Sequence, residues 1–332
     1  MRRLGYSPQD IMTPRYAADY RTLLWCLFMP VVALAQYVNP ELIPYLSPLG
    51  CYLALSAGVM AHNHNHCPTF KNRRMNALFG YWLSHFYGYP TFAWVPTHNL
   101  NHHKYVNKAG DATITWRYTD KNNAWVAFTY FFVSSYWQSD PIKQYIRKAR
   151  QSNPTLFRQI ILQYVMWAGL HLALLGLAIA WYGFVQGLKV WSFAFLIPAL
   201  FALWTIMFFN YIQHVHTDPW SEHDHSRSFD GMLINFFLFN NGLHAAHHEM
   251  PGAHWSTLPE AHARIAPHIH PELVQRSFFG WCFRTYVLAP FSSRFGTKQV
   301  GRAPFDVPAG ETLTLASADV DALESGINAA RT

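Results

Sequence analysis

Long apolar stretches alternate with polar segments along the chain. The apolar stretches cover residues 22–38, 42–61, 160–184 and 190–212. A helix needs about 20 largely apolar residues to cross a hydrocarbon core of roughly 30 Å, so each stretch predicts a membrane-spanning helix. An Asn-Pro turn separates the first two stretches, and residues 185–189 separate the last two. The pattern therefore predicts two hairpins through the membrane.

The remaining segments complete the predicted organisation, which is an all-α integral membrane protein with four transmembrane helices and a helical cap. Two aromatic-rich runs, 75–95 and 123–137, are interrupted by Gly, Pro, His or Ser and are expected at the membrane interface. We expect an N-terminal cytoplasmic segment (1–21), hairpin 1 (22–61), a cytoplasmic or interfacial cap (62–157), hairpin 2 (158–213), a second cap segment (214–302) and a flexible acidic tail (303–332).

Composition agrees with a membrane protein. Of the 332 residues, 51% are hydrophobic and only 13% are charged, which is too apolar for an ordinary soluble protein. The four cysteines form no CxxC pair, so neither a disulfide framework nor a zinc–thiolate site is indicated. The polar, charged N-terminus differs from a cleaved signal peptide, and we expect it to be retained.

The distribution of Lys and Arg predicts the orientation. Residues 62–157 hold eleven Lys or Arg against three Asp, whereas the two hairpin tips together hold only Lys189. Because cytoplasmic loops are enriched in Lys and Arg, both termini and the cap are expected in the cytoplasm. A bacterial inner membrane is favoured over the endoplasmic reticulum.

The most informative residues are clustered histidines. Three segments, AHNHNHC, THNLNHHK and GLHAAHHEMP, carry histidines spaced three or four residues apart, and NYIQHVH places Asn210 four residues before His214. Such neighbours share one helical face, at a separation from which two imidazoles can reach one metal ion. The candidate ligands are His62, His66, His98, His102, His103, His214, His244, His247 and His248.

Nine imidazoles suit two ions of four or five protein ligands each, and imidazole favours Fe, Zn, Cu and Ni. A single catalytic zinc takes about three protein ligands, which argues against one zinc site. His64 lies about 200° around the helix from His62 and is expected to have a supporting role. His216 is the alternative to His214 as a metal ligand, and it could otherwise have a supporting role.

The three segments HNHNH, HNLNHH and HAAHH resemble the histidine boxes HxxxH, HxxxHH and HxxHH of membrane fatty-acid desaturases. The order of the boxes agrees, as do Pro251 and the run LPEAH after the third box. The resemblance extends over residues 22–271 and implies an O2-dependent di-iron enzyme that removes two hydrogens from adjacent methylenes of an acyl chain.

The resemblance also implies the partners of the site. The nine histidines would bind two Fe ions, and Asn210 would hold one through a water. The substrate would be a fatty acyl lipid or an acyl thioester. An external ferredoxin, rubredoxin or cytochrome b5 type protein would supply electrons, because the chain shows no nicotinamide fingerprint and no flavin or haem site. Nothing in the sequence indicates a nucleic-acid partner.

Two departures from the family pattern leave the reaction open. Asn63 replaces an acidic residue common in the first box, and Glu249 follows the third box where an apolar residue is common. Metal-binding histidines donate their other nitrogen to an outer partner, for which Asp111, Asp230 and Glu249 are candidates. A hydroxylase or ketolase on the same scaffold is the main alternative, and a zinc lipid hydrolase or metal transporter is a more distant one.

Overall fold

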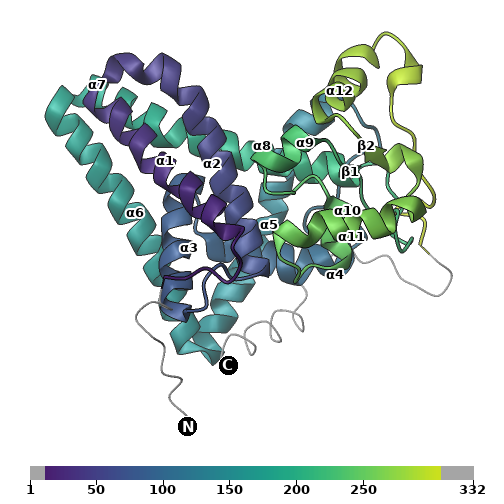
Figure 1. Ribbon diagram of the computed structural model, residues 1–332, viewed down its shortest axis with the longest axis horizontal. Coiled ribbons are helices and arrows are strands. Elements are labelled where there is room, and N and C mark those ends of the chain that lie inside the picture. Colours follow the sequence, from purple (N-terminus) through teal and green to yellow (C-terminus); the bar gives the residue numbers. More distant parts are fainter. Residues whose placement is uncertain (1–11, 308–332) are drawn as a thin grey trace. The chain divides into compact units, whose positions relative to one another are not determined.

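The computed structural model describes residues 12–307, which form a mostly helical chain with two short strands (Figure 1). Most of the predicted acidic tail and the first eleven residues lie outside the described range. The chain divides into two units, one of residues 1–93 and 158–205 and the other of residues 94–157 and 206–332.

The first unit contains the longest apolar helices. Its elements are α1 (Asp19–Val38), η2 (Pro40–Leu42), α2 (Ile43–His66), α3 (Arg73–Tyr87), η3 (Thr91–Ala93), most of α6 (Pro154–Tyr182), α7 (Phe184–Trp191), η5 (Ser192–Leu196) and the first half of α8 (Ile197–His214). The Asn72 side chain caps α3 by accepting from the amides of Arg74 and Met75, and Gly88 ends this helix with a φ of +88°.

Four helical segments are long and apolar enough to cross a membrane: Asp19–Val38, Pro40–His66, Pro154–Tyr182 and Phe184–His214. The prediction of four apolar helices is confirmed, although the second helix runs five residues beyond its predicted end and includes His66. Helices α1 and α2 pack against each other. Only 6% of the most apolar window of α6 is buried, as suits a helix whose surroundings are lipid. The two-hairpin topology stays a prediction.

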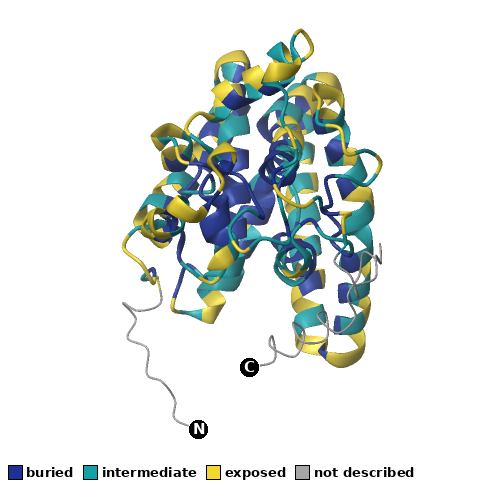
Figure 2. Ribbon diagram, turned by 90° about the vertical axis from the view of Figure 1, so that its right-hand side faces the viewer, coloured by how far each residue is buried: buried dark blue, intermediate teal, exposed yellow. Residues whose placement is uncertain are grey.

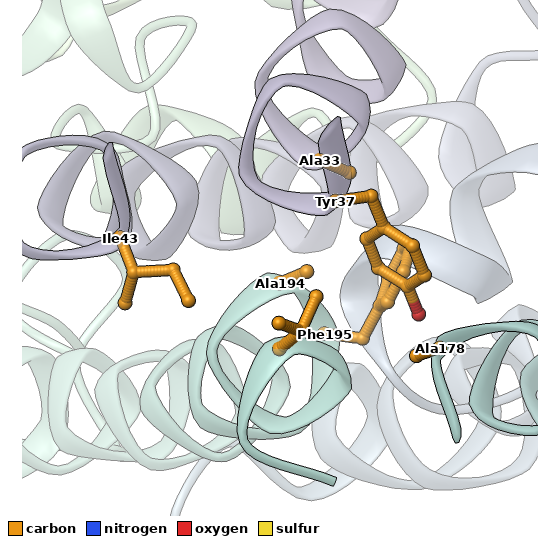
Figure 3. Close-up of a cluster of buried hydrophobic side chains, with 7 residues drawn as sticks. Ala33, Tyr37, Ile43, Ala178, Ala194 and Phe195 are labelled. Atoms are coloured by element: carbon orange, nitrogen blue, oxygen red, sulfur yellow. The ribbon is translucent and has the colours of Figure 1, made fainter. Parts of the chain in front are cut away.

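A buried cluster joins helices of the first unit that are distant in sequence. Figure 3 shows Tyr37 and Phe195 beside Ala178. The ring centroids of Tyr37 and Phe195 lie 6.0 Å apart in an edge-to-face arrangement. The Tyr37 hydroxyl also donates to the carbonyl of Leu174 at 3.2 Å. The cluster therefore fixes α1 against α6 and η5 by both apolar packing and a hydrogen bond.

Apart from the long helix α5 (Ala124–Ser152), the second unit contains short elements: η4 (Val95–His102), α4 (His103–Tyr105), the end of α8, β1 (Ser228–Phe229), α9 (Met232–Phe237), α10 (His244–Glu249), η6 (Trp255–Thr257), α11 (Leu258–Ile265), η7 (Ala266–His268), η8 (Pro271–Leu273), β2 (Val274–Gln275), α12 (Phe278–Cys282), η9 (Phe283–Leu288) and η10 (Ser293–Phe295). β1 and β2 pair in parallel, with Ser228 opposite Val274. The all-α prediction omitted this ladder because two residues give no detectable alternation.

The second of the two aromatic runs, 123–137, forms the first half of α5, a single helix that continues to Ser152. Trp125, Phe128, Phe132 and Tyr136 are exposed on one face of this helix. The opposite face places Ala127 and Tyr130 in a buried cluster with Tyr211 and Ile212 of α8. Figure 2 shows how buried, intermediate and exposed positions are distributed along the ribbon.

Gly187 provides a test of the packing between α6 and α7. A Cβ at this position would lie 2.5 to 2.6 Å from backbone atoms of Ala178 and Ile179, whereas a Cβ at Gly176 would meet nothing within 4 Å. We expect Gly187→Ala to lower the free energy of unfolding by about 1–3 kcal/mol, because backbone atoms cannot move aside cheaply. Thermal unfolding of the purified protein would measure the change. Gly176→Ala is the matched control, and equal stability of the two variants would contradict the close contact.

Candidate metal centre

The second histidine box lies on an unusual helical segment. η4 is a π-helix, and it places His98 and His102 one turn apart with their rings stacked at 5.2 Å. Short π-helical segments occur frequently at functional sites. His103 follows directly at the start of α4. The box thus presents three imidazoles from a single turn and a half of helix.

Four histidines of the second unit bring one ring nitrogen each to a common point. The Nε2 atoms of His102 and His214 lie 3.1 Å apart, those of His214 and His244 2.9 Å, and those of His244 and His248 3.1 Å. Two nitrogens bound to one ion at about 2.1 Å and at a right angle lie about 3.0 Å apart. This four-histidine group could therefore hold a metal ion.

A second group of the same unit contains His98, His103 and His247. The Nε2 atom of His103 lies 3.1 Å from that of His98 and 3.0 Å from that of His247. This three-histidine group adjoins the four-histidine group, because the rings of His103 and His248 are 4.4 Å apart. Two ions at adjacent positions would fit these rings.

The protonation of the rings suits metal binding. Burial and the neighbouring rings of His103 and His244 hold the pKa of His248 well below its usual range. A neutral imidazole retains a lone pair for an ion, whereas a protonated one has none. His248 is therefore in the form that a ligand requires at pH 7.

The first histidine box lies in the first unit, at the end of α2. His62 and His66 are one turn apart, and their rings meet edge to face at 4.9 Å. His64 is engaged elsewhere, since its Nδ1 lies 3.0 Å from the Thr69 hydroxyl and its Nε2 3.2 Å from the Asn76 carbonyl oxygen. Both nitrogens of His64 thus have partners within the first unit.

Asp111 fixes the orientation of His102. The fully buried carboxylate accepts from His102 Nδ1 at 2.8 Å, which leaves Nε2 facing the four-histidine group. It also accepts from the Asn107 amide and from the amide and hydroxyl of Thr113. Burial alone would raise the pKa of Asp111, but His102 and the Thr113 hydrogen bonds lower it below its usual value. The carboxylate therefore stays ionised.

A strained turn between the second histidine box and Asp111 brings the Asp111 carboxylate back to His102. Val106 and Asn107 have φ values of +46° and +65°, and the left-handed region is unfavourable for a β-branched residue such as Val106. Asn107 secures the turn, because its side chain donates to the carbonyl of His214 at 3.0 Å and accepts from the amide of Thr115 at 2.8 Å. The strained backbone at Val106 and Asn107 thus lies where it positions Asp111 beside His102.

The end of α8 is held by backbone carbonyls and a buried arginine. His214 Nδ1 lies 3.2 Å from the His225 carbonyl oxygen, which directs its Nε2 to the four-histidine group. The Arg227 guanidinium donates to the carbonyls of Ile212 and Val215 and lies 4.8 Å from the Trp281 ring. A cation stabilises the negative end of a helix. Burial lowers the pKa of Arg227 to about 10, so it remains charged at pH 7.

The third box is fixed by a close backbone contact. The Phe229 amide of β1 donates to the Gly242 carbonyl at 2.7 Å, and a Cβ on Gly242 would lie 2.4 Å from the Phe229 carbonyl oxygen. Only glycine fits this approach. β1 thus positions the segment from which His244, His247 and His248 project.

Asn210 lies one turn before His214. Its Nδ2 donates to the Tyr130 hydroxyl at 2.9 Å, and that hydroxyl donates to the carbonyl of Thr113. Thr113 in turn contacts His102 and Asp111. Asn210 is therefore joined through Tyr130 to the residues that orient His102.

The other sequence candidates lie at the periphery. His216, the rival to His214, bonds through its two nitrogens to the Thr297 hydroxyl at 2.8 Å and the Asp120 carbonyl at 2.7 Å. Glu249 accepts from His223 at 2.7 Å near the surface. Asp230 is exposed just before α9. The sequence pattern indicated no role for Thr113, Tyr130 or Arg227. Tyr130 and Arg227 contact residues that are distant in the chain, Asn210 and Trp281 respectively, whereas Thr113 bonds to the nearby Asp111.

We expect Asp111→Asn to weaken metal binding about 10–100-fold, because loss of an outer partner of a ligand has effects of that size. The measurement is metal content per chain after titration against a competing chelator. Asp120→Asn is the matched control, since Asp120 is exposed in the same segment. Unchanged metal affinity in Asp111→Asn would contradict the orienting role.

Comparison with known proteins agrees with this geometry. The fatty acid desaturase family model matches residues 41–280, a range that includes all three histidine boxes. No curated protein and no solved structure matches the chain significantly. Because the family match covers more than half of the sequence, the chain belongs to the fatty acid desaturase family.

Proposed function

We propose that the chain is an O2-dependent fatty acyl desaturase that introduces a double bond into a long acyl chain at a histidine-bound di-iron centre. The observation that carries the proposal is the convergence of ring nitrogens into two adjacent groups, in a chain of the fatty acid desaturase family. Neutral imidazole is a suitable ligand for iron. Bound iron would supply the activation of O2 and the removal of two hydrogens from adjacent methylenes.

The proposed ligands are the nine box histidines. The four-histidine group supplies one set, and the three-histidine group with His62 and His66 supplies the other. The first unit holds the last two rings side by side at the end of α2. Their assignment to the second set rests on the box pattern of the family.

The protein's own residues have orienting roles in this proposal. Asp111 accepts a hydrogen bond from Nδ1–H of His102, which keeps the proton on Nδ1 and leaves the Nε2 lone pair of His102 facing the four-histidine group. The His225 carbonyl has the same role for His214. Asn210 uses Nδ2 on Tyr130, so its carbonyl oxygen is the group that would accept from a water ligand. These contacts hold the rings in place before an ion arrives.

The four apolar helices support a membrane protein with substrate entry from the bilayer. We propose that the termini and the histidine groups lie in the cytoplasm of a bacterial cell. The substrate would be an acyl lipid or acyl thioester. An external ferredoxin, rubredoxin or cytochrome b5 type donor would deliver the two electrons.

Product analysis tests the reaction. Purified protein, supplied with a ferredoxin and its reductase, would be incubated with acyl lipids carrying a fully deuterated chain. We expect mass spectra to show loss of two deuterium atoms from one chain, because desaturation removes them from neighbouring carbons. The same preparation without the donor is the control. Incorporation of oxygen would instead assign a hydroxylase or ketolase and would overturn desaturation.

Replacement of ligands separates activity from folding. We expect His248→Ala to reduce activity below detection and to lower bound iron from two ions per chain, while the protein still inserts into the membrane. His216→Asn is the control and should retain both, since asparagine tolerates the positive φ of 57° at this position. Full activity in His248→Ala, or one zinc per chain in the unmodified protein, would contradict the di-iron assignment.

A further inference from the structure

Two helices of the second unit follow the two strands of the short ladder, α9 after β1 and α12 after β2. β1 and β2 run parallel, so α9 and α12, which follow them, start at the same end of the ladder (Figure 1). The approach is close, because a Cβ on Gly231 before α9 would lie 2.2 Å from the carbonyl oxygen of Arg276 before α12. The ladder therefore acts as a common base for both helices.

The inner sides of these helices are anchored on the last turns of α8. Phe278 stacks on Phe209 with ring centroids 4.6 Å apart, and Tyr286 of η9 meets Phe208 at 5.9 Å. Ile234 of α9 packs on the same buried cluster. Thus α9, α12 and η9 form one body with the end of the fourth apolar helix.

The outer sides carry large apolar side chains that are exposed in the described structure. Met232 is 82% exposed and Phe291 is 86% exposed. Phe279, Phe283 and Val287 are spaced four residues apart, so they share one side of the helix. We call this set the apolar outer face: Met232, Leu233, Phe236, Phe237, Phe279, Phe283, Val287 and Phe291. Several large exposed apolar side chains on helices that start from one ladder are typical of a surface that contacts protein or membrane.

Charge distinguishes between these two kinds of contact. Residues 276–302 contain five cations, Arg276, Arg284, Arg294, Lys298 and Arg302, and no Asp or Glu. Aromatic and aliphatic residues on one side, with cations beside them, are typical of helices that lie at an anionic bilayer surface. The anchoring on α8 adds to this, because the segment Phe184–His214 is long and apolar enough to cross a membrane, and the end of such a helix would lie at that surface.

We propose that α9 and the α12–η9 segment rest on an anionic bilayer, with the apolar outer face in the boundary between headgroups and acyl chains and the arginines at the lipid phosphates. The same turns of α8 carry His214, so this lipid contact would fix the depth of the four-histidine group relative to the membrane. The proposal requires that α8 spans the membrane, and it is independent of the reaction.

Depth measurement with nitroxide labels tests the contact. In the full chain with Cys26, Cys51, Cys67 and Cys282 replaced by Ala, labels would be attached at Phe236→Cys and Phe279→Cys. A label at Glu260→Cys, an exposed position of α11, is the control. In phosphatidylcholine–phosphatidylglycerol nanodiscs we expect the first two labels to be accessible to O2 and shielded from a water-soluble nickel chelate. The control label should show the opposite.

Two outcomes would overturn the proposal. One is equal access of the nickel chelate to all three labels. The other is shielding of the Phe236→Cys and Phe279→Cys labels only after an electron-donor protein is added, which would make the face a protein-docking surface.

A second measurement needs no label and compares the unmodified chain with a charge-reversal variant. We expect amide hydrogen exchange in residues 278–288 to slow when phosphatidylglycerol is added to phosphatidylcholine nanodiscs, and the triple variant R276E/R284E/R294E to lose this response. Exchange in α11 should not depend on the lipid. Identical exchange of residues 278–288 in both lipids would count against the anionic contact.

Discussion

Buried imidazole nitrogens that face one another at 2.9 to 3.1 Å are the constraint on which the second unit depends. Their lone pairs repel unless a cation or a shared proton lies between them, and burial lowers the pKa of His248, which disfavours its protonation. Hydrogen bonds and packing around the rings must therefore hold these imidazole nitrogens close together. Much of the surrounding structure supplies them.

Each of these contacts ties a ligand to a different part of the unit. A fully hydrogen-bonded carboxylate, Asp111, holds His102, and the carbonyl of His225 holds His214. Arg227 closes the carbonyl end of the helix that carries His214 by donating to the carbonyls of Ile212 and Val215. The backbone contact at Gly242 positions the third box. Helix ends, a strained turn and a two-stranded ladder thus converge on one cluster.

The sequence predicted the features that depend on local spacing. Four apolar helices follow from composition and length, and the close rings of His98 and His102 follow from helical periodicity. Asp111 could be only one candidate among several, because it reaches His102 through a left-handed turn at Val106 that no local pattern indicates. Arg227 and Tyr130 act on partners that are distant in the chain. Long-range contacts of this kind leave no signal in a single sequence.

The two pairs of consecutive histidines have a consequence for how the site can vary. His102 belongs to the four-histidine group and its neighbour His103 to the three-histidine group, and His248 and His247 divide in the same way. Adjacent Cα atoms across a trans peptide are always about 3.8 Å apart. The spacing between the two groups is therefore built into the covalent backbone at two places. Substitution of the histidines can remove the ligands of either group, but substitutions elsewhere in the chain have little effect on the distance between the two groups.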